Sequence, residues 1–373
     1  MSVYLLVLAI AAAVTYLTTP LARRLAQRTG AVTAVRARDV HTIPTPRLGG
    51  VAMVAGLGAA LVFASQTRFL QPVFSDSLPW AILACAVGIC LLGVADDIWD
   101  LDWITKLIGQ IVVAGVLAWQ GVQLASLPIF GLTIGSFRLS LMVTVIVVVV
   151  AINAVNWVDG LDGLAAGVIA IGGSAFFIYT YVLTQNNNPT DYSNLATVLI
   201  AAVVGGCLGF LPHNFHPARI FMGDSGAMAL GLTVAAAAIM VTSQIDPNVL
   251  EARQAIPAFV PIILPVAVLM LPLLDVGVTS LRRLLSGKSP FHADRTHLHH
   301  KLLDRGHSHR RAVAIMYVWT GVISFSAAAL VWFPLQQVLI GAGIGAVLAT
   351  IITVVPLPTP AFLKQRTAGP DHS

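Results

Sequence analysis

The sequence has few charged residues, and this scarcity restricts the kind of protein it can be. Lys, Arg, Asp and Glu make up 10% of the 373 residues, whereas 57% are hydrophobic. Soluble domains carry about 25% charged residues. Glutamate occurs only at Glu251. These proportions argue against a soluble enzyme with a single anchor and predict a polytopic membrane protein.

Cysteine is also scarce, and its spacing indicates neither a disulfide framework nor a zinc site. The three cysteines, Cys85, Cys90 and Cys207, all lie within apolar runs. We expect them to behave as small buried hydrophobic side chains. The first apolar run, 1–19, has no basic region before it, because the nearest arginines follow it. It therefore predicts a retained first helix with its N-terminus outside, rather than a signal peptide.

Apolar runs long enough to span a membrane recur along the whole chain. They predict an all-α fold of about eleven transmembrane helices, near residues 3–19, 48–66, 80–95, 105–121, 140–158, 163–184, 195–212, 227–243, 256–278, 313–333 and 337–355. We expect one integral-membrane catalytic domain over residues 1–355, followed by a disordered cytoplasmic tail over residues 356–373.

The distribution of positive charge predicts how these helices are oriented. With the N-terminus outside, 18 of the 21 Lys and Arg residues fall in the inner segments, and all ten histidines fall there as well. The positive-inside rule therefore predicts a cytoplasmic C-terminus. Any chemistry carried by the polar motifs would face the cytoplasm.

Four carboxylates lie close together in the motif Asp96-Asp97-Ile98-Trp99-Asp100-Leu101-Asp102, which Lys106 follows. Like charges at this spacing repel one another, so a divalent cation, a basic partner or a substrate must offset them. Adjacent aspartates at a membrane surface suit Mg²⁺, which binds one or two carboxylates together with substrate phosphates. A solvated acidic loop is the alternative interpretation.

A second polar motif runs from Asn153 to Gly163, directly after an apolar run without charge. Its members Asn156, Asp159 and Asp162 are three residues apart, so on a continuous helix they share one face. Ionisable groups at a membrane boundary are functional by default. The alternative is a polar end of a helix that the glycines of the motif terminate.

Glycines flank a single aspartate in the motif Phe221-Met222-Gly223-Asp224-Ser225-Gly226. Such glycines would let an ion or a ligand approach the backbone closely. Asp224 and Ser225 could instead serve only as the N-cap of the helix that follows.

Basic residues and histidines form two further motifs. The first contains Arg38, His41 and Pro46-Arg47-Leu48-Gly49-Gly50, and it suits either a binding loop or a loop that contacts anionic lipid. The second lies between Ser289 and His307 and contains His292, Arg295, His297, His299 and His300. An arginine beside imidazoles suits a phosphate or a nucleotide, and the spacing fits zinc sites poorly.

One mechanism accounts for all five motifs. Carboxylates would bind Mg²⁺, and Mg²⁺ with arginines would bind a diphosphate. The reaction would then be phosphoryl transfer between a cytosolic nucleotide and a lipid acceptor. A membrane transporter is the alternative from another class of protein, but transporter sites lie near the bilayer midplane, whereas these motifs lie at the predicted inner rim.

Together the motifs resemble those of the polyprenyl-phosphate N-acetylhexosamine-1-phosphate transferases. Asp-Asp-x-x-Asp, Asn-Ala-Val-Asn-x-x-Asp-Gly-Leu-Asp-Gly, Phe-Met-Gly-Asp-Ser-Gly and His-x-His-His occur here in the order of that family, within residues 36–307. The segments Pro46–Gly50 and Asp294–His300 are similar to the WecA/TagO-type branch, which attaches GlcNAc-1-phosphate to undecaprenyl phosphate. Use of UDP-N-acetylmuramoyl-pentapeptide or of another UDP-sugar is the alternative.

The resemblance implies a role for each matching residue. Asn156 and Asp224 would hold Mg²⁺, or Mn²⁺ in its place, on the diphosphate. Asp96, Asp97 and Asp159 would be catalytic, with Asp96 or Asp97 as a base near the acceptor phosphate. The substrate-binding residues would be Arg38, His41, Lys106, Asp162 (near the uracil), Arg295, His297, His299 and His300.

The resemblance also implies the substrates and the location. UDP-GlcNAc would be the donor, and undecaprenyl or decaprenyl phosphate in the bilayer would be the acceptor. The protein would lie in the bacterial plasma membrane with its active site facing the cytoplasm. No nucleic acid is expected as a partner, and a homodimer is left open.

Overall fold

The structure is a computed structural model that describes residues 1–32, 44–124, 136–186, 192–243 and 307–354, together with Ala267, Met270 and Leu302. These residues form ten α-helices and one short 3-10 helix, and no β-strand occurs among them. Nine of the described helices are long and apolar enough to cross a membrane. The predicted all-α, polytopic membrane fold is therefore confirmed.

The helices follow the predicted apolar runs. Their bounds are α1 (Ser2–Thr29), α2 (Gly49–Gln66), α3 (Leu78–Trp99), α4 (Trp103–Trp119), α5 (Phe137–Val158), α6 (Leu164–Asn186), α7 (Tyr192–Asn214), α8 (Gly223–Thr242), α11 (His309–Ala329) and α12 (Leu335–Val354), with the 3-10 helix η1 (Gln71–Ser75). The predicted helix at 256–278, apart from two residues, and the tail at 356–373 lie outside the described residues. The orientation across the membrane stays a prediction.

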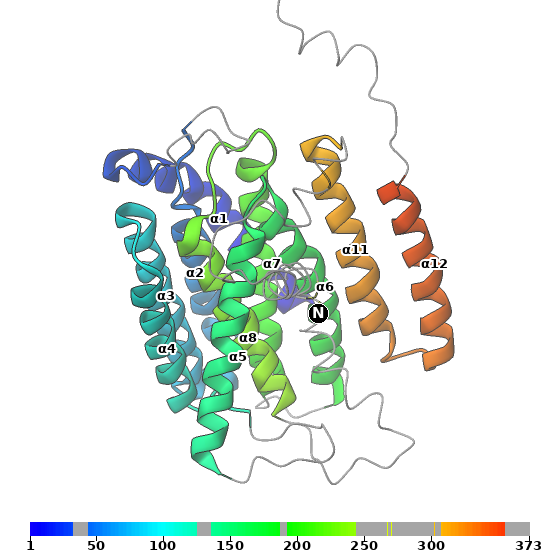
Figure 1. Cartoon of the computed structure of the whole chain (residues 1–373). Helices are drawn as coiled ribbons and strands as arrows, with labels where there is room; N and C mark the ends of the chain where they lie inside the picture. The colour runs from blue at the N-terminus through cyan, green and yellow to red at the C-terminus, as the bar shows by residue number, and fades with distance from the viewer. Residues whose placement is uncertain are drawn as a thin grey trace, which may run out of the picture.

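Helix α8 lies within the bundle and is almost entirely buried, with α3, α5, α7 and α2 packed around it (Figure 1). Its sequence is apolar on all sides and rich in alanine and glycine. Such a helix is suited to the centre of a membrane bundle, because small side chains let neighbouring helices approach closely. Helix α12 lies at the edge and is mostly exposed.

Exposed aromatic side chains mark both ends of three neighbouring helices. Trp99, Trp103 and Trp157 lie at one end of α3, α4 and α5, and Trp80, Trp119 and Phe137 lie at the other end. Aromatic side chains gather at the two membrane interfaces. The acidic motif, which includes Trp99, therefore lies at the level of a membrane surface.

Helix α1 is longer than its apolar run predicts. It continues past residue 19, through Pro20, and ends at Thr29, where Gly30 adopts a left-handed conformation with φ 77°. The buried side chains of Ala22 and Ala26 continue the packed stripe of the helix. Packing, and not only the membrane-spanning length, therefore determines where this helix ends.

Candidate active site

Three of the predicted motifs meet at one end of α8. Asp96 lies in the last turn of α3, Lys106 near the start of α4, Asn156 in the last turn of α5 and Asp224 in the first turn of α8. Lys106 Nζ lies 2.8 Å from Asp96 Oδ2 and 3.5 Å from Asp224 Oδ2. The side chain of Asn156 donates a hydrogen bond to Asp224. The carboxyl groups of Asp96 and Asp224 also lie within hydrogen-bonding distance of each other.

Asp159 completes this group directly after the end of α5. Its carboxylate accepts a hydrogen bond from the Gly223 N–H. Burial raises the pKa of Asp159 to about 7, and the negative charges of Asp224 and Asp97 add to the shift, which the Arg47 guanidinium partly opposes. Burial is the main cause of this raised pKa, and the contribution of Asp224 and Asp97 shows that several carboxylates lie close to Asp159.

The donor set fits a hard divalent cation such as Mg²⁺. Asp96, Asn156, Asp159 and Asp224 bring side-chain oxygens to the site, whereas Lys106 and Arg47 are the cations that the described residues place near them. Oxygen ligands of this kind are what Mg²⁺ prefers, and Mg²⁺ also takes oxygens from substrate phosphates. The side chain of Asp224 is 22% exposed, so it remains accessible to an ion and a substrate.

The acidic motif does not act as one unit. Asp100 is exposed, and its backbone adopts a left-handed conformation with φ 52°. Asp102 is the N-cap of α4, because its carboxylate accepts hydrogen bonds from the Ile104 and Thr105 N–H groups at 3.0 Å each. Asp96 and Asp97 belong to helix α3 and not to a loop. The interpretation as solvated carboxylates therefore holds for Asp100 and Asp102. Asp96 and Asp97 are instead buried at the end of α3, next to the first turn of α8.

We predict that Asp102→Ala lowers the free energy of unfolding by about 1 kcal/mol, the usual cost of losing an N-cap. Its kcat/KM should stay unchanged, because the capping carboxylate points to the α4 backbone. Asp102→Asn is the matched control and should retain most of the stability, since asparagine caps about as well as aspartate. Thermal unfolding and turnover of both variants check this. Loss of turnover in Asp102→Asn would show that Asp102 has a chemical role.

The segment before α2 holds the Phe221–Gly226 motif through backbone hydrogen bonds. The Phe221 N–H donates to Pro46 O at 2.7 Å, the Gly49 N–H donates to Phe221 O at 3.0 Å, and the Gly50 N–H donates to Met222 O at 2.9 Å. The first turn of α8, which carries Asp224, is thus fixed to the start of α2. This contact gives the glycine pair of the first basic motif a structural function.

Two glycines allow α2 and α3 to approach the first turn of α8. A Cβ atom at Gly50 would lie 2.0 Å from Gly226 N, and one at Gly93 would lie 2.4 Å from Ser225 Cα. Both distances are far below van der Waals contact with backbone atoms, which cannot move aside as a side chain can. The position of Asp224 therefore depends on these two close approaches.

The structure corrects the expectation that Asn156, Asp159 and Asp162 share one face of a helix. Helix α5 ends at Val158, and the chain turns before α6 begins at Leu164. Asp162 is 2% exposed, and its carboxylate is hydrogen-bonded to His216 and to the Ala218 N–H in the loop between α7 and α8. The expectation was wrong because the backbone leaves the helical conformation at Asp159, which has ψ 49°, so Asp162 lies beyond the end of α5.

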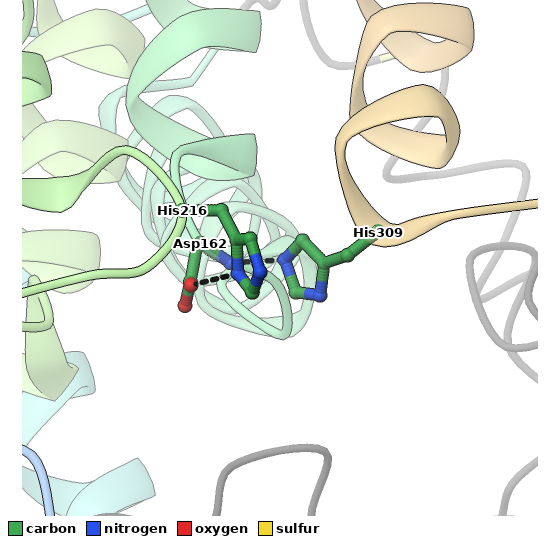
Figure 2. Close-up of side chains that lie close together, drawn as sticks. All are labelled: Asp162, His216 and His309. Carbon is green, nitrogen blue, oxygen red and sulfur yellow. Dashed lines mark hydrogen bonds and ion pairs between the residues drawn. The ribbon is translucent and has the colours of Figure 1, made fainter. Parts of the chain in front are cut away.

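Asp162 forms a second cluster with two histidines, one from the α7–α8 loop and one from the start of α11 (Figure 2). His216 Nδ1 lies 2.7 Å from Asp162 Oδ2, and the Asp162 N–H donates to His309 Nε2 at 3.1 Å. The two imidazole rings stack with centroids 4.4 Å apart and 20° between their planes.

The geometry of this cluster does not favour a metal centre, although one ligand atom from each residue lies within 4.8 Å of the others. The ring nitrogens of His216 and His309 that face Asp162 already take part in hydrogen bonds. Ring nitrogens bind metals along directions in the ring plane, and nearly parallel stacked rings do not point at one common ion. Asp162, His216 and His309 therefore form what we call the lock, a hydrogen-bonded cluster that holds the α5–α6 turn in place.

Helix α11 strengthens this lock on both loops. The Tyr317 hydroxyl donates to Gly163 O, and the Arg310 guanidinium donates to His216 O at 3.0 Å. Sequence reasoning missed His216, His309 and Tyr317. The available signal was weak: His216 and His309 are imidazoles at predicted membrane boundaries, outside the recognised motifs.

We predict that His309→Leu lowers the free energy of unfolding by roughly 1–3 kcal/mol, because the buried Asp162 N–H loses its acceptor. His309→Gln should lose less, since its amide oxygen can accept the same bond. Thermal unfolding measures both variants. The unfolding temperature of the wild type should not respond to a zinc chelator, and a clear decrease would contradict the assignment as a lock.

Six of the predicted substrate-binding residues lie outside the described residues: Arg38, His41, Arg295, His297, His299 and His300. Their roles stay predictions. Lys106 lies in the carboxylate cluster, whereas Asp162 lies in the separate lock, and the predicted substrate-binding role of each stays a prediction.

The fold and the site define a polytopic membrane protein with a carboxylate-rich site at one membrane surface. The sequence profile of glycosyl transferase family 4 matches residues 79–242. The chain is 42% identical over 355 residues to a decaprenyl-phosphate N-acetylglucosaminephosphotransferase of Mycolicibacterium smegmatis, over 93% of this chain and 87% of the relative. It is 32% identical over 325 residues to a probable undecaprenyl-phosphate N-acetylglucosaminyl 1-phosphate transferase of Bacillus subtilis, over 85% and 83% of the two chains.

A phospho-N-acetylmuramoyl-pentapeptide-transferase of Desulforudis audaxviator is 32% identical over 230 residues, which cover 56% of this chain and 66% of the relative. The chain belongs to the polyprenyl-phosphate N-acetylhexosamine-1-phosphate transferases, within glycosyl transferase family 4. The resemblance to the WecA/TagO-type branch is confirmed.

Proposed function

We propose that the protein transfers N-acetylglucosamine-1-phosphate from UDP-GlcNAc to a polyprenyl phosphate and releases UMP. The observation that carries this proposal is the convergence of Asp96, Lys106, Asn156 and Asp224 at the level of a membrane surface. Relatives named for N-acetylglucosamine transfer cover most of the chain, whereas the pentapeptide transferase covers about half of it. This difference supports GlcNAc over the muramoyl-pentapeptide.

The reaction is a single displacement at phosphorus. An oxygen of the acceptor phosphate forms a bond to the β-phosphorus of UDP-GlcNAc, and the bond from that phosphorus to the oxygen shared with the α-phosphate breaks. UMP leaves, and polyprenyl-diphosphate-GlcNAc forms. The acceptor phosphate is already anionic near neutral pH, so a carboxylate need only orient it or take its last proton. No covalent enzyme intermediate is needed.

The chain's own residues hold the charges in place for this step. Mg²⁺, with Mn²⁺ as an alternative, would neutralise charge on the diphosphate, and Asn156 and Asp224 are its proposed ligands. Lys106 is 26% exposed and lies between Asp96 and Asp224, so its ammonium group is placed to bind a phosphate at the membrane surface. The His-Arg motif before α11, with Arg295, would clamp the nucleotide sugar.

We place the site on the cytoplasmic face of a bacterial plasma membrane. The support is the concentration of 18 of the 21 Lys and Arg residues in the segments on that side. UDP-GlcNAc is a polar nucleotide sugar and would approach from water. The acceptor would approach from the bilayer, past the exposed indoles of Trp99, Trp103 and Trp157.

Turnover with a panel of donors tests the proposal. The purified protein is incubated with Mg²⁺, decaprenyl phosphate and either UDP-GlcNAc or UDP-N-acetylmuramoyl-pentapeptide. We expect UMP from UDP-GlcNAc, and only when the lipid is present. Efficient use of the pentapeptide donor would contradict the choice of sugar. Uptake of a nucleotide sugar into vesicles without UMP formation would indicate a transporter instead.

A further inference from the structure

The two adjacent aspartates at the end of α3 have different partners. Asp97 Oδ1 accepts a hydrogen bond from the Asp224 N–H, and Asp97 Oδ2 accepts one from the Ser225 N–H, both at 3.2 Å. Asp96 instead accepts from the Leu101 N–H at 2.9 Å and pairs with Lys106 at 2.8 Å. Both carboxylates are buried. Asp97 therefore faces the backbone of α8, whereas Asp96 faces the cation of the site.

The contact of Asp97 meets a need of helix α8. The first N–H groups of any helix have no partner inside the helix. The residue at the N-cap position of α8 is Met222, which supplies no capping side chain. A carboxylate from α3 takes that place, and its negative charge also complements the positive end of the helix dipole. Asp97 thus caps α8 from a neighbouring helix.

We propose that Asp97 is a positioning residue, which fixes the first turn of α8 so that the Asp224 carboxylate faces Lys106 and Asn156. This inference rests on the proposed function, because the sequence left both Asp96 and Asp97 as candidates for the base. Both oxygens of Asp97 are directed at backbone amides, so they are poorly placed to take a proton from an acceptor phosphate. Its carboxylate acts through Asp224.

Hydrogen exchange of the full-length protein without added metal tests the inference directly. The amides of Asp224 and Ser225 lie at the start of α8, so the bonds to Asp97 are what protects them. Asp97→Asn should speed exchange in the peptide that covers residues 222–226 by about tenfold, because a charged acceptor becomes a neutral one. Asp96→Asn is the matched control and should leave exchange there unchanged, since Asp96 contacts the Leu101 N–H and the side chains of Lys106 and Asp224, and the bonds to the Asp224 and Ser225 amides come from Asp97.

Turnover adds a readout that a loss of stability alone would not give. Asp97→Asn should need more Mg²⁺ for half-maximal activity and should keep the shape of the wild-type pH profile. A base would instead lose turnover at every Mg²⁺ concentration and would lose the acidic limb of that profile. If the wild type showed no transfer at all, the proposed function would fail while the exchange result still decided the role of the contact.

Unchanged exchange at residues 222–226 in Asp97→Asn would overturn the proposal. If that variant does not fold, Asp97→Glu replaces it, because it keeps the charge and displaces the carboxylate by one methylene. Faster exchange with an unchanged pH profile in Asp97→Glu supports the positioning role. Wild-type exchange together with lost turnover in Asp97→Glu contradicts it.

Discussion

Asp224→Asn is expected to lower kcat/KM roughly 100-fold or more, equivalent to about 2.7 kcal/mol of lost transition-state stabilisation. Asp224 pairs with Lys106, accepts a hydrogen bond from Asn156, and is the proposed ligand of the divalent cation. A neutral amide weakens all of these charge-assisted interactions at once, and each is worth about 1.5–3 kcal/mol. The measurement is kcat/KM over a range of Mg²⁺ concentrations.

The fold of this variant should be intact, because the Asp224 side chain does not cap α8. Thermal unfolding should therefore change little while turnover falls. Asp102→Asn is the comparison variant, since it removes a nearby charge whose role is only to cap α4. Near-normal turnover of Asp224→Asn at low Mg²⁺ would show that Asp224 does not hold the cation.

Gly93→Ala is expected to destabilise the protein by about 1–3 kcal/mol and to reduce turnover strongly. The new methyl group would lie 2.4 Å from Ser225 Cα, so α3 and the first turn of α8 must separate. That separation would move the amides of α8 away from Asp97 and displace Asp224. Thermal unfolding and kcat/KM together measure the two effects.

Gly88→Ala is the matched control on the same helix. Its methyl group would lie 3.9 Å from Val113 Cγ2, which is an ordinary contact. Alanine is the better helix former, so this variant should be as stable as the wild type or up to about 1 kcal/mol more stable. If both variants behaved alike, the close approach of Gly93 to α8 would not determine the site.

Much of the fold could be predicted from the sequence, because each membrane span is an uninterrupted apolar run. Ten of the eleven predicted helices match described helices, and the remaining one lies almost wholly outside the described residues. The convergence of Asp96, Lys106, Asn156 and Asp224 was also predictable. Their motifs all fall at helix ends on the same predicted side, and a helical bundle brings such ends together.

The details of the site depend on contacts that no local pattern contains. Asp162 follows Asp159 at helical spacing, but residues far away in the sequence hold it. His216 and the Ala218 N–H bond its carboxylate, and His309 accepts from its backbone N–H. Likewise, the two hydrogen bonds that Asp97 accepts from the α8 backbone come from amides 127 and 128 positions later in the sequence. The N-cap role of Asp102 is different, because aspartate just before a helix was a local signal for it.

The most direct test of this account follows the β-phosphate of the donor. The purified protein is given Mg²⁺, decaprenyl phosphate and UDP-GlcNAc with a radiolabelled β-phosphate. If GlcNAc-1-phosphate is transferred directly, the label moves with GlcNAc into the lipid diphosphate and the released UMP is unlabelled. Label in free UDP or inorganic phosphate, or label bound covalently to the protein before lipid is added, would contradict a direct transfer of GlcNAc-1-phosphate.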